Sequence, residues 1–140
     1  RNRQVWEKQQ KNLLLTELFM SKESISKIYL ILEKITYIEK IVADEKNITN
    51  ALNDLVTSRP AILMHMTAIA EQFDKLKKEH AKHLLDSFDE ADIKGMYDVR
   101  TYIAHEYEGV NMAIVEWIIR NGLPKFKKQC MLLIEEANIE

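Results

Sequence analysis

The fold is decided by residues 24–43, which read SISKIYLILEKITYIEKIVA. Apolar side chains recur in this stretch at spacings of three and four, the period at which side chains share one face of an α-helix. The apolar stripe comprises Ile25, Ile28, Leu32, Ile35, Ile38 and Val42. The spacing predicts a helix from about Ser24 to Ala43 that buries one face, followed by a polar interruption at residues 44–54.

A second helix is expected to start near Ser58. This serine is a suitable N-cap, and Pro60 then falls in the first turn, where the missing N–H of proline has no helical partner to lose. A second apolar stripe with helical spacing follows. Its members are Ile62, Met66, Ile69, Phe73 and Leu76. The polar residues 77–83 are expected to close this helix.

A third helical region follows this polar stretch. Ser87 and Glu90 have the three-residue spacing of a capping box, which predicts a short helix starting there. Gly95 is expected to break it. The helix that then follows carries Met96, Val99, Tyr102 and Ile103 and is expected to end around His105.

The last two helices are marked by their termini. Asn111 is expected to cap the first of them, and Asn121-Gly122 is expected to stop it. Pro124 is then expected to open the final helix. The sequence therefore predicts an all-α fold, an antiparallel bundle of about five helices.

Composition agrees with this fold and excludes several classes of protein. The 140 residues, 46% of them hydrophobic, suffice for one domain with a sizeable core. The 3 Gly and 2 Pro are too few for the turns of a β-rich fold. The single cysteine excludes a disulfide framework and a Cys-based zinc site. The net charge of −2 excludes a generic basic nucleic-acid binder, but leaves room for a local basic site.

The distribution of apolar residues along the chain also bears on targeting signals and domain limits. No apolar run approaches the ~18 residues that a membrane span requires, and the N-terminus does not resemble a signal peptide. We therefore expect no membrane association and a cytoplasmic location. The bundle domain is expected to comprise residues 20–140. Residues 1–19 are expected to be an N-terminal helical extension or a non-native segment, and they are compatible with packing on the bundle or on a partner.

The most informative stretch for chemistry is residues 97–107, YDVRTYIAHEY. A histidine that titrates near neutrality moves protons to and from ribose and leaving-group oxygens, and an arginine forks two hydrogen bonds to a phosphate. A tyrosine orients a phosphate or stacks on a base. Arg100, His105 and Tyr107 are therefore candidates for RNA cleavage without a metal. The structural alternative is that Arg100 pairs with a surface carboxylate, His105 caps a helix end and Tyr107 packs.

The spacing of Arg100 and His105 sets a geometric condition on such a site. On a straight helix the two side chains lie about 140° apart and do not face one small ligand. Two arrangements remain open. Either the helix ends at His105 and the ring turns back, which Gly109 favours, or a second copy of the chain completes the site.

The region around these residues resembles the HepT branch of the HEPN superfamily, the toxin half of bacterial and archaeal toxin–antitoxin pairs. The family signature is Arg, four to six residues, His, one residue and Tyr, which is met here by Arg100, His105 and Tyr107. The resemblance covers about residues 20–137. Further matching segments are Glu108-Gly109-Val110, Leu123-Pro124, Arg59-Pro60-Ala61-Ile62 and Ile69-Ala70-Glu71-Gln72.

The resemblance implies an α-helical homodimer that acts as a metal-independent endoribonuclease without a cofactor, with both motif copies lining a cleft between subunits. It implies that Arg100 and His105 are catalytic and that Tyr107 supports RNA binding or catalysis. The substrate RNA is left open between tRNA and mRNA. The implied partner is a cognate MntA-like nucleotidyltransferase antitoxin, as in type VII systems. Such an antitoxin silences the toxin by AMPylation of the motif tyrosine, here Tyr107, which adds charge and bulk.

Two residues beside the motif qualify this interpretation. Thr101 stands where active family members commonly carry Asn, Asp or His, and its hydroxyl donates and accepts hydrogen bonds but is not a strong base. Asp98 is expected either to hold the Arg100 guanidinium or to be a solvated carboxylate. We assign both residues a supporting role. The alternative function is a non-enzymatic HEPN helical dimer that binds a nucleotidyltransferase.

Overall fold

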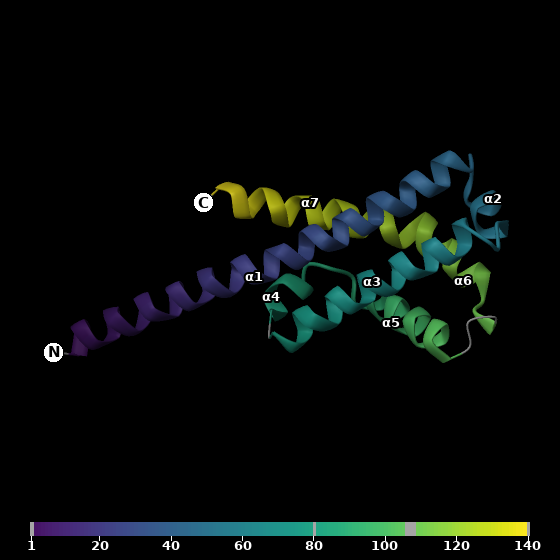
Figure 1. Cartoon of the computed structure of the whole chain (residues 1–140). Helices are drawn as coiled ribbons and strands as arrows, with labels where there is room; N and C mark the ends of the chain where they lie inside the picture. The colour runs from purple at the N-terminus through teal and green to yellow at the C-terminus, as the bar shows by residue number, and fades with distance from the viewer. Residues whose placement is uncertain (1, 80, 106–108, 140) are drawn as a thin grey trace.

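The computed structural model describes residues 2–79, 81–105 and 109–139, and every long element among them is an α-helix. The elements are α1 (Asn2–Asp44), α2 (Ile48–Asn53), α3 (Ser58–Lys78), α4 (Lys82–Leu85), α5 (Glu90–His105), α6 (Met112–Trp117), the π-helical turn η2 (Ile118–Gly122) and α7 (Leu123–Ile139). Figure 1 shows α1, α3, α5 and α7 running back and forth as the long helices of a bundle. α1 packs against α3 and α7, and α3 also packs against α5. The predicted all-α fold is confirmed.

Helix α1 is much longer than predicted. It starts at Asn2 rather than near Ser24, and it ends at Asp44, one residue beyond the predicted end. Its N-terminal part projects past the other helices (Figure 1), and residues 2–11 are exposed, with Trp6 at 60%. The proposed limit between residues 19 and 20 stays a prediction and falls inside this continuous helix. In the described part of the chain, no helix combines the length and the apolarity needed to cross a membrane.

The core lies between the long helices and contains the predicted stripes. Ile28, Ile35 and Ile38 of α1 are at most 1% exposed, and all five stripe residues of α3 are buried to the same degree. The remaining members of the α1 stripe are partly buried against this core. Cys130 of α7 is fully buried, and burial raises the pKa of its thiol to about 12, so the cysteine acts as a core side chain.

Three phenylalanines from distant segments meet at the centre of the core. The ring of Phe73 on α3 lies 5.1 Å from that of Phe88 and 5.2 Å from that of Phe126, measured between centroids. Phe88 precedes α5 and Phe126 belongs to α7. Offset and edge-on aromatic contacts of this kind stabilise beyond the area that they bury. The cluster therefore links α3, α7 and the approach to α5.

The start of α3 is capped differently from the prediction. Ser58 is the first helical residue, but its hydroxyl donates a hydrogen bond to Glu45 Oε1 at 3.0 Å. The backbone N–H groups of residues 56–58 donate to the carboxylate of Asp54 at 3.0 to 3.2 Å. These bonds, that of Ser58 first, lower the pKa of Asp54. Asp54 therefore supplies the capping acceptor that was expected from Ser58.

Helix α5 is one continuous element, although a start at Ser87 and a break at Gly95 were expected. The backbone N–H groups of residues 91 and 92 donate to Asp89 Oδ1, so Asp89 is the capping acceptor rather than Ser87. Gly95 lies inside the helix and does not break it, which makes that prediction wrong. The predicted end at His105 is confirmed.

The C-terminal helices follow the prediction at one end and depart from it at the other. Asn111 caps α6, and its side chain accepts a hydrogen bond from the backbone N–H of Ala113 at 2.9 Å. The predicted stop at Asn121-Gly122 is wrong, because η2 leads directly into α7 without a loop. Pro124 lies in the first turn of α7, as predicted. The predicted polar interruption after α1 contains the short helix α2, capped by Asn47.

Candidate functional site

The candidate motif lies in the last two turns of α5. Because the helix is continuous from Glu90 to His105, Arg100 and His105 stay about 140° apart around its axis. Arg100 is partly buried, whereas His105 is exposed and forms no hydrogen bond or ion pair with any other described residue. Within one chain, the helix thus gives the two side chains different directions. Tyr107 lies outside the described residues.

Arg100 is positioned by contacts with α3 and with its own helix. Its Nη1 lies 3.9 Å from Asp74 Oδ2, and its Cζ lies 5.3 Å from the centre of the Tyr97 ring. The side chains of Arg100 and Asp74 are 30% and 29% exposed. At 3.9 Å the pair is an ion pair rather than a hydrogen bond. The guanidinium is therefore held in place while its N–H donors remain available to an anion such as a phosphate.

The charges around Arg100 fix the protonation of its neighbours. A hydrogen bond from Lys78, at 2.9 Å, is the main cause that lowers the pKa of Asp74, and the positive charge of Arg100 contributes to the same shift. Burial, and then the negative charge of Asp74, raises the pKa of Tyr97, while Arg100 opposes this rise. At neutral pH the site therefore contains an Asp74 carboxylate and a neutral Tyr97 phenol.

The two supporting residues of the motif contact other groups. Asp98 is 54% exposed and pairs with Lys94 at 3.3 Å, and the Thr101 hydroxyl donates to the backbone carbonyl of Tyr97 at 3.0 Å. Neither forms an ion pair or hydrogen bond with Arg100 among the described residues. Asp74 thus lies beside the guanidinium, where the sequence suggested Asp98. The motif carries no signal for Asp74, because this residue comes from another helix.

Replacing Asp74 with asparagine is expected to make the fold less sensitive to acid. The pKa of Asp74 lies below its ordinary value of 3.8 in the folded chain, so its carboxylate stabilises the fold above that pH, and this contribution is lost as the pH falls through 3.8 toward the folded pKa. At neutral pH we expect a loss below about 1 kcal/mol, since partly exposed ion pairs contribute little. Thermal unfolding followed by circular dichroism from about pH 7 to about pH 3 measures this. The wild type and the variant should converge at low pH, and a constant gap would contradict the assignment.

Comparison with known proteins gives one match. The sequence model of the HepT-like family, whose description is "Ribonuclease HepT-like", matches residues 31–133. This span is more than two thirds of the chain, and it contains α3, α5 and both described residues of the motif, Arg100 and His105. No curated protein and no solved structure matches the chain.

Proposed function

Since the chain belongs to the HepT-like ribonuclease family, we propose that it is an endoribonuclease toxin whose active site is completed by a second copy of the chain. The observation that carries this proposal is the continuity of α5, which directs Arg100 and His105 to different sides of one helix. A helix that ends at His105 is compatible with both arrangements from the sequence, and we propose the one that needs two chains because Arg100 and His105 lie on different sides of the helix. In a symmetric dimer, Arg100 of one protomer then meets His105 of its partner.

The two side chains supply what RNA cleavage by the 2′-hydroxyl requires. His105 acts as general base or general acid, removing the 2′-OH proton or protonating the departing 5′-oxygen. The 2′-oxygen bonds to phosphorus as the bond to the 5′-oxygen breaks, which yields a cyclic phosphate and a free 5′-hydroxyl. Arg100 stabilises the negative charge that grows on the phosphoryl oxygens. No step requires a metal, so the proposed reaction is metal-independent.

Exposed apolar side chains on α5 and α6 support dimer formation. Tyr102 lies between Arg100 and His105 on α5 and is 54% exposed. Ile114 and Trp117, one turn apart on α6, are 45% and 53% exposed. Aromatic side chains of this kind are enriched at protein interfaces.

Regulation is proposed to follow the family pattern. The partner is a cognate MntA-like nucleotidyltransferase antitoxin that AMPylates Tyr107, two residues after His105. The added phosphate carries negative charge, which would compete with RNA phosphate for Arg100. We propose that both proteins act in the cytoplasm, on tRNA or mRNA.

A second candidate function is a non-enzymatic HEPN dimer that binds the nucleotidyltransferase. The side chain after the motif arginine favours it, because the Thr101 hydroxyl already donates to the Tyr97 carbonyl within α5. This residue therefore contributes neither a base nor an amide to the site.

One assay separates the two candidates. Purified protein is incubated with total RNA in the presence of EDTA, and the products are tested for cyclic phosphate ends. Cleavage that survives chelation supports the ribonuclease. Intact RNA, together with a stable complex with the nucleotidyltransferase, would support the non-enzymatic dimer.

Mixing two inactive variants tests the shared site directly. If Arg100 of one chain works with His105 of the other, a heterodimer of Arg100→Ala and His105→Ala contains one intact pair. Random reassociation of equal amounts is then expected to restore about a quarter of the wild-type rate. Each variant alone, refolded in the same way, is the control. No recovery in the mixture would show that both groups of a pair come from one chain.

The conservative change Arg100→Lys is expected to restore only part of the activity that Arg100→Ala removes. Losing a preorganised group that stabilises transition-state charge costs about 10²–10³-fold in kcat. Lysine keeps the charge but cannot donate two parallel hydrogen bonds to a phosphate. Single-turnover cleavage rates measure both variants, and a lysine variant as active as the wild type would contradict bidentate binding.

A further inference from the structure

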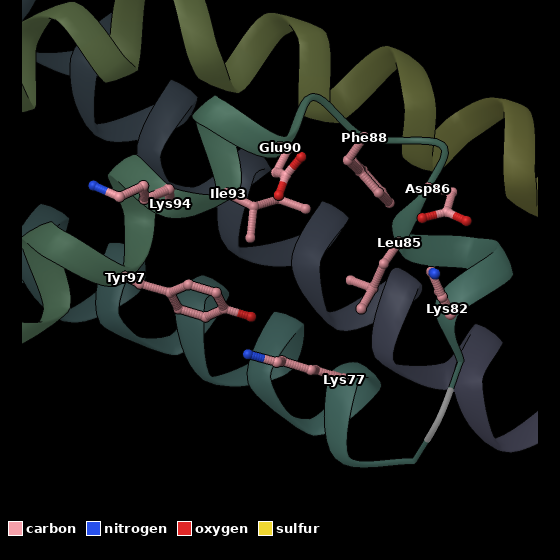
Figure 2. Close-up of a pocket in the computed structure, with 9 residues that line it drawn as sticks. All are labelled: Lys77, Lys82, Leu85, Asp86, Phe88, Glu90, Ile93, Lys94 and Tyr97. Atoms are coloured by element: carbon pink, nitrogen blue, oxygen red, sulfur yellow. The ribbon is translucent and has the colours of Figure 1, made fainter.

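A pocket of about 990 Å³ lies beside the candidate site, between the end of α3, α4 and the first half of α5 (Figure 2). Tyr97 forms part of its wall, and the same ring lies 5.3 Å from the Arg100 guanidinium. The volume is at the upper end of the range for small-ligand sites. The pocket and the candidate site therefore share one side chain.

The pocket has an apolar middle, and charged side chains of both signs surround it. Leu85, Ile93 and the ring of Tyr97 line the middle. Figure 2 shows Lys77 on the lower side, where it reaches toward the hydroxyl end of Tyr97, and Lys82 on the right side, below Asp86. The carboxylates of Asp86 and Glu90 lie on the upper side of the same view. Such a pocket suits a ligand that is anionic at one end and donates hydrogen bonds at the other.

Two of the pocket lysines are available to a ligand. Lys94 pairs with Asp98 at 3.3 Å, and its ammonium group points away from the other lining residues in Figure 2. In contrast, Lys77 and Lys82 form no ion pair with any other described residue. Lys77 also helps to lower the pKa of Asp74, which places its charge close to the ion pair of Asp74 and Arg100.

We propose that this pocket binds one nucleotide of the RNA substrate. Its phosphate contacts Lys77, the next phosphate along the strand contacts Lys82, its base lies on the apolar middle against the Tyr97 ring, and an exocyclic amine of adenine, cytosine or guanine donates to Asp86 or Glu90. This inference rests on the proposed ribonuclease function and deepens it. The Tyr97 ring lies 5.3 Å from the Arg100 guanidinium. The nucleotide in the pocket is therefore close to the scissile phosphate that Arg100 contacts in the proposed site.

The carboxylates of Asp86 and Glu90 favour a nucleotide over a simple anion as the ligand of this pocket. A simple anion would be repelled by Asp86 and Glu90, whereas a nucleotide turns its base toward them and its phosphate toward Lys77. A free nucleotide shares this chemistry with a nucleotide in a strand. The strand is favoured because the Tyr97 ring lines the pocket and also lies 5.3 Å from the Arg100 guanidinium, the proposed contact of a second phosphate of the same molecule.

Base preference is the first test. Short fluorescein-labelled 2′-O-methyl oligonucleotides, which lack the attacking hydroxyl, are titrated with wild-type protein and followed by anisotropy. We expect oligo(A) and oligo(C) to bind about tenfold more tightly than oligo(U), which has no exocyclic amine. The double variant Asp86→Ala with Glu90→Ala should lose this preference and bind oligo(A) and oligo(C) no more tightly than oligo(U). Equal binding of the three by the wild type would overturn the proposed base contact.

Salt dependence is the second test. Replacing both Lys77 and Lys82 with alanine should reduce the slope of log K against log salt by about 1.4, because each single-strand phosphate that a lysine neutralises adds about 0.7 to that slope. The matched control is Lys40→Ala plus Lys128→Ala, which removes the same charge from residues outside the pocket. Equal slopes in the pocket variant and the control would overturn the phosphate contacts. Circular dichroism of each variant confirms its fold.

The remaining outcomes separate this proposal from the ribonuclease itself. If the wild type cleaves RNA in EDTA but the pocket variant matches its control in binding and cleavage, the nucleotide pocket is overturned and the ribonuclease is retained. If the pocket variant loses RNA binding although the wild type cleaves nothing, the pocket is supported and the ribonuclease is overturned. If AMP and CMP bind in the pocket but the oligonucleotides do not, a strand as the source of the nucleotide is overturned.

Discussion

Substituting alanine for His105 is expected to lower the rate of RNA cleavage by about 10²–10⁴-fold, the usual contribution of a positioned general acid or base. The exposed position of His105 at the end of α5 leaves the ring free to meet a substrate, and the substitution removes little packing. Folding should therefore be unchanged while the chemical step slows. Single-turnover cleavage of a labelled RNA in EDTA, with enzyme in excess, measures this step.

The matched control for His105 is His83→Ala, which removes an exposed histidine from α4. This variant should cleave at the wild-type rate. The pH profile adds a second readout, because the limb due to the catalytic imidazole should disappear only when His105 is replaced. Undiminished cleavage by His105→Ala would exclude this residue from proton transfer.

The largest expected effect on stability comes from Phe73→Ala. Its ring is fully buried and contacts both Phe88 and Phe126. Its removal therefore leaves a cavity that α3, α7 and the segment before α5 cannot fill by small shifts. Deleting a buried phenylalanine costs about 3–5 kcal/mol, a large part of the stability of a small domain. The midpoint of thermal unfolding should fall by roughly 10–20 °C.

The control for Phe73 is Met64→Ala on the same helix. Met64 is 73% exposed, so its truncation removes little buried surface and should change the free energy of unfolding by less than about 0.5 kcal/mol. Chemical denaturation of both variants gives the comparison. A Phe73→Ala loss as small as that of Met64→Ala would show that the three rings do not form one cooperative core.

The long helices were predictable because their buried faces repeat along the chain. The stripes of residues 24–43 and 58–76 depend only on local spacing, and both are buried or partly buried. The caps depend on tertiary contacts. Ser58 has the right chemistry for an N-cap, but its hydroxyl donates a hydrogen bond to Glu45, thirteen residues earlier. The free backbone N–H groups at the start of α3 donate to Asp54 instead.

Glycine proved a poor guide to helix ends in this chain. Gly95 costs about 1 kcal/mol inside a helix relative to alanine, but Met96 and Val99 beside it are buried, and packing of this face outweighs that cost. At Gly122 the helix continues instead of ending, because the π-helical turn η2 accommodates about one extra residue in its turn. There the backbone N–H of Leu123 donates to Ile118, and α7 continues from the same turn.

The candidate site could be predicted only as far as the motif extends. Arg100 and His105 were found from their spacing and their chemistry, since both lie in one segment. Asp74, Lys77 and the pocket beside Tyr97 come together through the packing of α3 on α5, and no spacing along the sequence encodes that contact.

In the proposed complex with RNA, the ion pair of Arg100 with Asp74 weakens the binding of any single phosphate. The arriving phosphate shares the guanidinium with the Asp74 carboxylate, and repulsion between the two anions offsets part of the attraction. A single small anion therefore gains little binding free energy at this site. A polymer that brings several charges at once gains from each of them, so we expect the proposed site to prefer long polyanions before any base contact forms.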